Sequence, residues 1–296
     1  MNAIIYCLGS ILIFAIQSLP LALAAQIGRF GGALAYWIDK RHRLVALQNL
    51  AMCFPEKSET EITALAKESY RRLGENYVCA VKTAGMDIKD LLPRVEINGL
   101  EKLQPPRRIV VAAGHFGNFE LYARFVDSEQ GYTCAATYRA LKQPALNRLM
   151  EKLRARSGCL FFERRTQGAA LRMAMNQPAI VLGLMADQHG GKNGLRLPFM
   201  DHDCSTTPAP AIFALRYGCD LLTIVCFRTG LGRWRVEIGE KIPTHETDGK
   251  PRAVEAITRD VLRAQEKYIR RDPPNWFWVH RRWKPVENKA KSESKG

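Results

Sequence analysis

Residues 109–120 carry the strongest fold signal in this 296-residue chain, and they read IVVAAGHFGNFE. The first five are apolar and partly β-branched, which predicts a buried strand over Ile109–Ala113. Gly114 permits a sharp exit from that strand, and the segment 118–126 has helical spacing with Asn118 as its N-cap. The stretch therefore predicts a strand, a tight turn that carries His115, and a helix.

The pair His115 and Glu120 indicates acid–base chemistry. On one continuous helix, side chains five positions apart diverge by about 140°. We therefore expect His115 in the turn and Glu120 in the first turns of the helix, where the two side chains can meet. A carboxylate on one imidazole nitrogen fixes the tautomer and raises the basicity of the other nitrogen, as a general base requires. Such pairs also occur by chance, so the pair alone leaves a purely structural role open.

Strand and helix signals alternate along the rest of the chain. Strands are predicted at 109–113, 132–137, 180–184, 221–227 and 233–238, and helices at 59–84, 144–156, 168–175, 209–217 and 253–269. This alternation predicts an α/β fold with a mixed, mostly parallel central sheet flanked by helices, whose site residues gather at the carboxyl ends of strands. Residues 29–285 are expected to form one domain, followed by a disordered basic tail at 286–296.

The N-terminus has the composition of a membrane anchor. The first 28 residues contain no charged side chain, and the run 3–25 is long enough to cross a hydrocarbon core that needs about 20 apolar residues. Residues 1–28 are therefore predicted to be a membrane-anchoring helix. A cleaved signal peptide and a buried or interfacial helix stay open as alternatives, because 21–25 reads LALAA and Pro20 interrupts the apolar run. The basic segment 40–43 follows, which predicts that the catalytic domain lies on the cytoplasmic side.

Several common chemistries lack their signatures. The sequence has no G-x-S-x-G elbow and no Walker A motif, and residues 230–233 (GLGR) lack the third glycine of a dinucleotide fingerprint. The eight cysteines include no C-x-x-C pair and look like reduced thiols, several of them in apolar surroundings. Residues 201–204 (DHDC) are too crowded to converge on one ion, so we expect neither a metal nor a cofactor.

Further segments accompany residues 114–120 in a fixed order. They are Arg43 with 49–50 (NL), 53–56 (CFPE), 138–139 (YR), 144–147 (PALN), 163–164 (ER), 186–188 (ADQ), 197–199 (LPF), 206–208 (TTP) and 276–284 (WFWVHRRWK). Together with HFGNFE, a form of the H-x-x-x-x-(D/E) motif, they resemble the bacterial lipid A late acyltransferases, the lauroyl and myristoyl acyltransferase family of the glycerolipid acyltransferase-like superfamily. The resemblance runs from about residue 41 to residue 284. Residues 198–200 (PFM) depart from the Phe-Phe-Gly that the family often carries, which bears on acyl or acceptor preference.

The resemblance implies direct acyl transfer. His115 would take the proton of an acceptor hydroxyl as its oxygen attacks a thioester carbonyl, and Glu120 would orient the imidazole. The oxyanion would be stabilised by Arg164 of the ER segment or by backbone amides of the turn 114–118. Asn118, at the end of that turn, is counted among the substrate-binding residues.

Three more residues are expected to bind substrate. Arg139, Asp187 and Gln188 each follow a predicted strand closely, where polar groups can hold sugar hydroxyls or phosphates. Arginine suits phosphate because its planar guanidinium donates paired, charge-assisted hydrogen bonds. Asp187 has a bland alternative, in which it only caps a turn or pairs with a neighbouring arginine.

Charge favours anionic partners. The chain carries 44 Lys and Arg against 29 Asp and Glu, a formal net charge of +15. The resemblance implies as partners an acyl carrier protein thioester or, less favoured, coenzyme A as donor, a phosphorylated glycolipid as acceptor, and the bacterial inner membrane. The run 276–284 is expected to pack near the site, with Arg281 and Arg282 contacting an anionic headgroup. No nucleic-acid motif accompanies the charge, so we expect no nucleic acid and rank a membrane-tethered nucleic-acid-binding protein last.

The resemblance thus implies an acyltransferase that adds a fatty acyl chain to a hydroxyl of a lipid A precursor. The same chemistry on an ornithine lipid, a lysophospholipid or another glycolipid is the nearest alternative, because nothing in the sequence identifies the acceptor directly.

Overall fold

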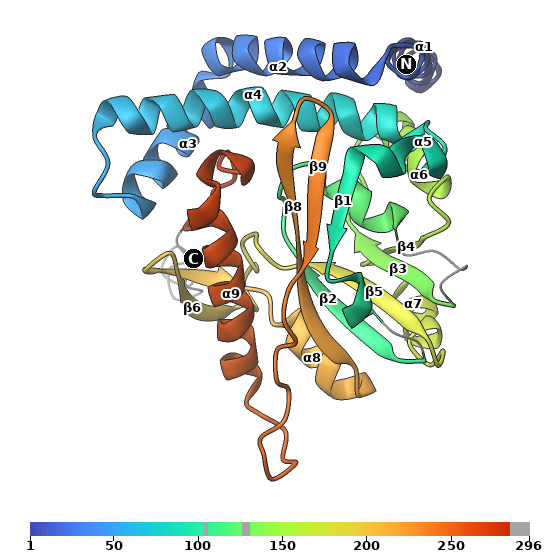
Figure 1. The fold of residues 1–296 in the computed structure, drawn as a ribbon, viewed down its shortest axis with the longest axis vertical. Helices are drawn as coiled ribbons and strands as arrows, with labels where there is room; N and C mark the ends of the chain where they lie inside the picture. Colours follow the sequence, from blue (N-terminus) through green and yellow to red (C-terminus); the bar gives the residue numbers. More distant parts are fainter. Residues whose placement is uncertain (104–105, 126–130, 285–296) are drawn as a thin grey trace, which may run out of the picture.

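The computed structural model describes residues 1–103, 106–125 and 131–284, and its centre is a seven-stranded sheet (Figure 1). Its strands are β1 (Val95–Asn98), β2 (Arg108–Ala113), β3 (Thr133–Tyr138), β4 (Leu160–Glu163), β5 (Ile180–Met185), β8 (Asp220–Gly230) and β9 (Arg233–Ile238). They lie in the order β1-β9-β8-β2-β5-β3-β4, and all neighbours are parallel except the hairpin β8–β9. A separate antiparallel hairpin joins β6 (Leu195–Phe199) to β7 (His202–Thr206).

Helices surround this sheet. They are α1 (Asn2–Ser18), α2 (Leu21–Ile38), α3 (Lys40–Cys53), α4 (Glu59–Ala84), α5 (Ile88–Leu91), α6 (Pro144–Ala155), α7 (Gly168–Ala174), α8 (Ala209–Tyr217) and α9 (Val254–Arg271), with short 3₁₀ turns η1 (Leu92–Arg94), η2 (Leu100–Lys102), η3 (Phe119–Arg124) and η5 (Pro273–Asn275). The long helix α4 crosses one end of the sheet, and α2 lies along its outer side (Figure 1). A capping box explains where α4 begins, because Ser58 and Glu61 each accept a backbone N–H from the other.

The predicted α/β fold with its mostly parallel sheet is confirmed. The five predicted strands are β2, β3, β5, β8 and β9, and the five helices predicted between residues 59 and 269 are α4, α6, α7, α8 and α9. Four short strands, β1, β4, β6 and β7, were not predicted, because each has only four or five residues and no long apolar run. The expected helix at 118–126 is the 3₁₀ turn η3, and residue 126 lies outside the described part.

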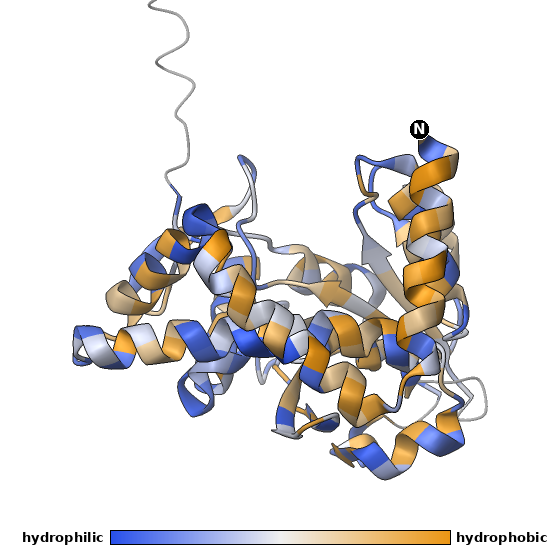
Figure 2. Ribbon diagram, turned by 90° about the horizontal axis from the view of Figure 1, so that it is seen from above, coloured by the Kyte–Doolittle hydropathy of each residue, from blue (hydrophilic) through white to orange (hydrophobic). Residues whose placement is uncertain are grey.

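The prediction that residues 1–28 form one continuous helix is wrong. The apolar segment is divided between α1 and α2, because the chain leaves the helical conformation at Leu19, just before Pro20. In the described part of the chain, no helix combines the length and the apolar character needed to cross a membrane. Figure 2 shows α1, which starts at the marked N-terminus, as an almost continuously hydrophobic helix.

Close packing holds the two N-terminal helices against the rest of the molecule. Gly28 and Gly32 of α2 face Gly74 of α4 so closely that a Cβ on any of the three would overlap backbone atoms of the opposing helix. Gly9 of α1 lies against α6, where a Cβ would overlap the end of the Leu149 side chain. The first helix is therefore part of the folded unit, packed on both α6 and α4.

Strand β2 is buried on both faces, as a central strand of a parallel sheet should be. Ile109, Val111 and Ala113 belong to one hydrophobic cluster, and Val110 and Ala112 belong to another on the opposite face. Because both faces are covered, β2 has no freedom to slip in register, and the residue that follows its end is held in a fixed place.

The run 276–284 packs into the core, as expected. Trp276 and Trp278 are buried, and Asn49 of α3 fixes the run by donating hydrogen bonds to the carbonyl oxygens of Trp278 (2.8 Å) and His280 (2.9 Å). The expected contact of Arg282 with an anionic headgroup is wrong. This side chain is fully buried, where it stacks on an aromatic ring and donates hydrogen bonds to β7.

Candidate active site

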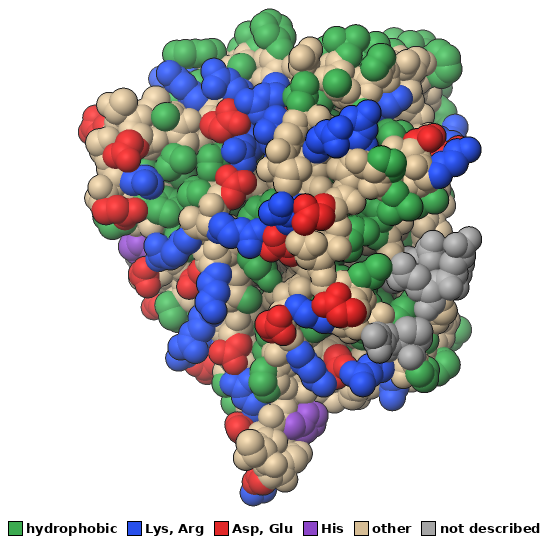
Figure 3. Space-filling model, in the orientation of Figure 1, with side chains coloured by type: hydrophobic (Ala, Val, Ile, Leu, Met, Phe, Trp, Pro, Cys, Tyr) green, Lys and Arg blue, Asp and Glu red, His purple; other side chains and the backbone are tan. Residues whose placement is uncertain are grey.

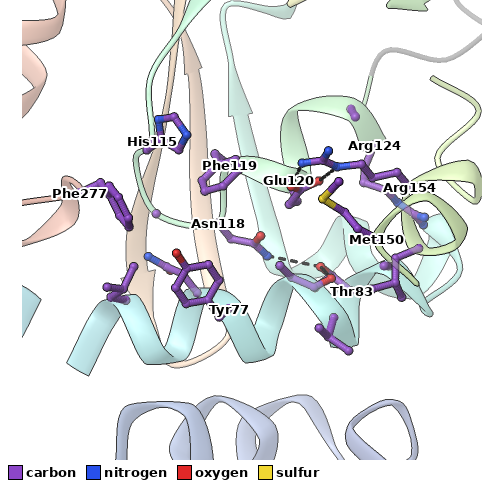
Figure 4. Close-up of a pocket in the computed structure, with 18 of the residues that line it drawn as sticks. Tyr77, Thr83, His115, Asn118, Phe119, Glu120, Arg124, Met150, Arg154 and Phe277 are labelled. Atoms are coloured by element: carbon purple, nitrogen blue, oxygen red, sulfur yellow. Dashed lines mark hydrogen bonds and ion pairs between the residues drawn. The ribbon is translucent and has the colours of Figure 1, made fainter. Parts of the chain in front are cut away.

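His115 lies in a tight turn at the carboxyl end of β2 (Figure 4). Two glycines make the turn possible. A Cβ on Gly114 would overlap the ring of Phe116. Gly117 has a φ of 52°, and a Cβ there would overlap the carbonyl oxygen of Cys226. The turn is also held from outside, because the amide of Gly117 donates to the carbonyl of Asn275 at 3.1 Å.

The partner of His115 is Asp187. Strand β5 pairs with β2 so that Met185 lies opposite Ala113, which brings the second residue after each strand to the same place. The Nδ1 atom of His115 lies 2.9 Å from Oδ1 of Asp187, and the backbone amide of His115 donates to Oδ2 at 2.7 Å. Trp276 donates its indole N–H to the same Oδ2 at 2.8 Å. This carboxylate is fully buried and held by three donors.

These contacts set the charge of Asp187. Burial by itself would raise the pKa of the carboxyl group, but the neighbouring His115 and the hydrogen bonds from His115 and Trp276 outweigh it and lower the pKa below its ordinary value. Asp187 is therefore an acceptor at neutral pH, so Nδ1 of His115 carries the proton. The Nε2 atom is left with its lone pair, which is the state that a general base needs.

Glu120 does not contact His115 in the way we expected. Its carboxylate pairs with Arg154 of α6 through hydrogen bonds of 2.6 and 3.1 Å. Glu120 thereby ties η3 to α6, while the imidazole is oriented by Asp187, for which we had predicted substrate binding. The side chain of Asn118 does not cap a helix as expected. It is buried and donates a hydrogen bond to the hydroxyl of Thr83 at 3.3 Å.

The Nε2 side of the ring faces open space. The His115 side chain is 19% exposed, and Phe119 and Phe277 flank the ring at centroid distances of 4.9 and 5.7 Å. The side-chain amide of Gln188 comes within 3.5 Å of Nε2. The predicted residues His115, Asp187 and Gln188 therefore form one cluster.

Most backbone amides of the turn that carries His115 are not free to stabilise an oxyanion. The amides of His115, Phe116 and Gly117 already donate to Asp187, to the Gly114 carbonyl and to Asn275, so these three amides of the turn are occupied. The side chains of Gln188 and Arg164 are candidate donors, because both line the cavity that opens beside His115.

An apolar cavity of about 530 Å³ opens on one side of His115. It lies between α1, α4, η3 and α6, and Figure 4 shows Tyr77, Phe119 and Met150 around it. Its lining is mostly aliphatic and aromatic and includes Leu12, Ile13, Leu73, Leu149 and Leu153. Such a space suits a hydrocarbon chain.

A larger cavity of about 1060 Å³ opens on the other side of His115. Six Lys and Arg side chains line it. Arg154 pairs with Glu120, and the other five form no ion pair within the described residues: Arg139, Arg164, Arg172, Arg216 and Lys284. Its two lining carboxylates already accept hydrogen bonds from Arg154 and from backbone amides. The cavity therefore has an unbalanced positive charge, which favours phosphate or carboxylate groups.

The model of one protein family, described as bacterial lipid A biosynthesis acyltransferase, matches residues 1–285. The chain belongs to this family. Bacterial lipid A biosynthesis acyltransferases transfer acyl groups, so the protein is an O-acyltransferase, and the expectation drawn from the sequence motifs is confirmed.

Individual relatives are similar along nearly their whole length. The chain is 26% identical over 284 residues to the lipid A biosynthesis palmitoleoyltransferase of Escherichia coli (strain K12), covering 90% of this chain and 86% of that protein. It is 24% identical over 285 residues to the lipid A biosynthesis lauroyltransferase of the same strain, with 94% and 90% covered. A lipid A biosynthesis acyltransferase of Haemophilus influenzae is 25% identical over 291 residues, with 95% and 90% covered.

Two features of the site escaped the sequence reasoning. The pairing of Asp187 with His115 had a signal, since both residues follow predicted strands and parallel neighbours end at one edge of the sheet. The order of the strands, which makes β2 and β5 neighbours, was not available from the sequence. Trp276 had no signal beyond its place in an aromatic run.

Proposed function

We propose that the protein moves a fatty acyl chain from an acyl carrier protein thioester to a hydroxyl group of a phosphorylated lipid A precursor. The observation that carries this proposal is the position of His115 at the junction of an apolar cavity and a cationic cavity. An acyl chain fits the first, and a phosphorylated sugar or the phosphate of a thioester arm fits the second.

The chemistry follows from the two nitrogens of His115. Nε2 takes the proton of the acceptor hydroxyl while its oxygen attacks the thioester carbonyl, and Asp187 stabilises the imidazolium from the Nδ1 side. Gln188 or Arg164 stabilises the oxyanion of the tetrahedral intermediate. Collapse of that intermediate breaks the C–S bond, and the leaving thiolate takes the proton back from Nε2.

Membrane association belongs to the same proposal. Large apolar side chains are exposed along α1 and α2: Ile4, Leu8, Ile11, Leu12, Phe14, Leu23, Ile27, Phe30, Leu34, Trp37 and Ile38. Figure 3 shows hydrophobic side chains gathered along the top of the molecule, over these helices, with Lys and Arg side chains just below. An apolar surface bordered by cations is typical of a protein that lies on anionic lipid. We propose that this surface rests on the inner membrane from the cytoplasmic side.

The function is tested by mass spectrometry of a tetra-acylated, phosphorylated lipid A precursor after incubation with a mixture of acyl carrier protein thioesters or coenzyme A thioesters. Wild-type protein should add one acyl chain, and His115→Ala should add none while melting at the wild-type temperature. A gain with His115→Ala would contradict the mechanism. No gain with well-folded wild-type protein would move the acceptor to another glycolipid or an aminolipid.

Location is tested separately. A reporter fused after Gly296 should be active on the cytoplasmic side, and activity only in the periplasm would contradict the proposed orientation. Flotation with anionic vesicles should be weaker for a variant with Phe14, Phe30 and Trp37 changed to serine, three side chains that are exposed in the folded protein.

A further inference from the structure

A third cavity, of about 520 Å³, lies at the opposite end of β2 from His115. It is formed where the start of β2 meets α7 and the end of α8, at the lower side of the molecule in Figure 1. Three of the six residues that line it are arginines, Arg108, Arg172 and Arg216, and the others are Asn176, Tyr217 and Gly218. The cavity is open to solvent, so a ligand can reach it.

The charge of this cavity is not balanced from within the protein. No carboxylate is among its lining residues, and in the part of the chain that the structure describes none of its three arginines forms an ion pair. The nearest acid along the chain is Asp220, which already pairs with Arg107 at 3.2 Å and with Lys241 at 2.5 Å. Three unpaired guanidinium groups around one space attract a group with several anionic oxygens, and a phosphoryl group has that geometry.

The cavity is connected to the catalytic site. Arg172, Arg216 and Tyr217 line both this cavity and the larger cationic cavity that contains His115. Five extended steps separate Arg108 from Ala113, about 17 Å at roughly 3.3 Å per residue, and His115 lies in the turn two residues further on. One long substrate can therefore have its reacting atom at His115 and an anionic group among the arginines.

We propose that Arg108, Arg172 and Arg216 form a phosphoryl subsite that holds the far end of a substrate whose reacting end lies at His115. The proposal rests on the acyl-transfer function proposed above. Two substrates carry a phosphoryl group far from the reacting atom: the phosphorylated glycolipid acceptor, and the thioester donor, whose pantetheine arm ends in a phosphodiester. The subsite recognises the chemistry that these two substrates share.

Arg108→Gln is the central test, because Arg108 lines this cavity and neither of the other two. Arg107→Gln is its matched control, since Arg107 is the adjacent arginine but lines none of the three cavities. Arg216→Gln, on an exposed position of α8, is a second variant that does not depend on how β2 begins. Assays in neutral detergent keep membrane binding out of the measurement.

Four substrates distinguish whether the phosphoryl group in the subsite belongs to the acceptor or to the donor. The acceptor is supplied with and without its phosphates, and the acyl donor is supplied as the carrier protein thioester and as the thioester of pantetheine, which lacks the phosphodiester. Losing one charge-assisted hydrogen-bonding group should raise KM by about tenfold. If the acceptor occupies the subsite, Arg108→Gln and Arg216→Gln raise KM for the phosphorylated acceptor and leave the dephosphorylated one unchanged. If the donor occupies it, the same pattern appears between the two donors.

Unchanged KM for both phosphorylated substrates in both variants would overturn the proposal. A loss confined to binding of anionic vesicles, with both KM values unchanged, would also overturn it and assign the patch to the lipid surface. Should the wild-type protein act on no lipid A precursor, the proposed function fails, and the subsite is tested by binding alone. Tungstate should then appear in crystals between the three guanidinium groups of the wild-type protein and of Arg107→Gln, and be lost in Arg108→Gln. Its absence from the wild-type protein would overturn the subsite itself.

Discussion

The two cavities that meet at His115 differ in both chemistry and construction. The smaller one is apolar and is built from helices, with α1, α4 and α6 supplying most of its wall. The larger one is cationic and is built from the ends of β3, β4 and β5 and the loops that follow them, with α8 at its far side. A single histidine contributes to both walls. In the proposed function, the apolar part and the phosphorylated part of the substrates occupy different cavities, and the bond that reacts lies at Nε2 of His115 between them.

The difference in construction predicts how each cavity responds to change. An apolar wall discriminates by length, because each further methylene that it buries contributes about 0.8 kcal/mol. A cationic wall discriminates by charge, because each guanidinium that meets a phosphate adds a directed, charge-assisted hydrogen bond. Variants of the first cavity should alter the choice of acyl chain, and variants of the second should alter the affinity for phosphorylated substrates.

The largest effect on activity is expected at His115, where the two cavities meet. Asp187→Asn keeps the shape of the buried side chain but removes the charge that fixes the tautomer of His115. By analogy with loss of the aspartate charge in a serine protease triad, we expect kcat to fall by about 10³- to 10⁴-fold. Steady-state kinetics of acyl transfer, with the melting temperature as a folding check, measures this.

Glu120→Gln is the matched carboxylate variant. It breaks an ion pair with Arg154 that is partly exposed, and it leaves the hydrogen bonds of His115 in place. We expect kcat to fall by about tenfold or less, since the median exposed ion pair is worth about 0 to 1 kcal/mol. If Glu120→Gln were as inactive as Asp187→Asn, the assignment of Asp187 as the sole orienting carboxylate would be wrong.

The next largest effect is expected for arginines of the cationic cavity. Arg139→Gln and Arg164→Gln each remove one unpaired guanidinium from the larger cavity. Each should raise KM for the phosphorylated acceptor by about tenfold, because a hydrogen bond to a charged group is worth about 1.5 to 3 kcal/mol. Arg165→Gln is the control, because Arg165 is adjacent to Arg164 and exposed but lines no described cavity. Equal effects from Arg164→Gln and Arg165→Gln would indicate a general charge effect instead of a binding site.

A smaller effect sharpens the apolar side. Ala80 of α4 lines the small cavity, and Ala80→Leu fills part of it. Each methylene of the acyl chain that no longer fits costs about 0.8 kcal/mol, which is about a fourfold change in kcat/KM. Competition between thioesters of different chain length should show a shift toward shorter chains. Ala64→Leu adds the same atoms to an exposed position of the same helix, and an identical shift there would disconnect the cavity from chain selection.

Sequence reasoning reached the parts of the site that are local in the chain. Five apolar residues and a glycine were enough to place His115 after a strand, and the position of Asp187 just past another strand was also correct. The partnership of these two residues was not predicted, because it depends on β2 and β5 being neighbours, across 72 positions of sequence. Glu120 was assigned to His115 because it is close in sequence, whereas the 3₁₀ turn directs it to Arg154.

The break between α1 and α2 teaches a related lesson. Hydropathy along residues 3–25 predicted one long helix, although Pro20 was noted as an interruption. Average hydropathy does not register a single backbone restriction, and the residue before a proline is disfavoured in the helical region. The packing of α1 on α6 through Gly9 depends on residues more than a hundred positions away, which no pattern within the N-terminal segment contains.

A residue of the cationic cavity should also make the stability of the folded protein depend on pH. His280 lines the cationic cavity, where burial and the charges of Arg282, His115 and His189 lower its pKa to about 4 against the opposing influence of Asp187. In the unfolded chain a histidine has a pKa of about 6.5. Between pH 6.5 and 4, His280 is therefore protonated in the unfolded state but stays neutral in the folded state. The folded state therefore loses stability as the pH falls through this window, by an amount on the order of 1 to 3 kcal/mol, and it has no such penalty above pH 6.5.

His280→Gln isolates this contribution. Glutamine can accept the backbone N–H that now donates to Nε2 of His280 at 3.2 Å, and it does not titrate. The free energy of unfolding, measured by urea denaturation from pH 7 to pH 4, should fall more steeply for the wild-type protein than for the variant. Parallel curves would mean that folding does not lower the pKa of His280. Burial and the nearby charge of Arg282 would then not be enough to keep His280 neutral as the pH falls.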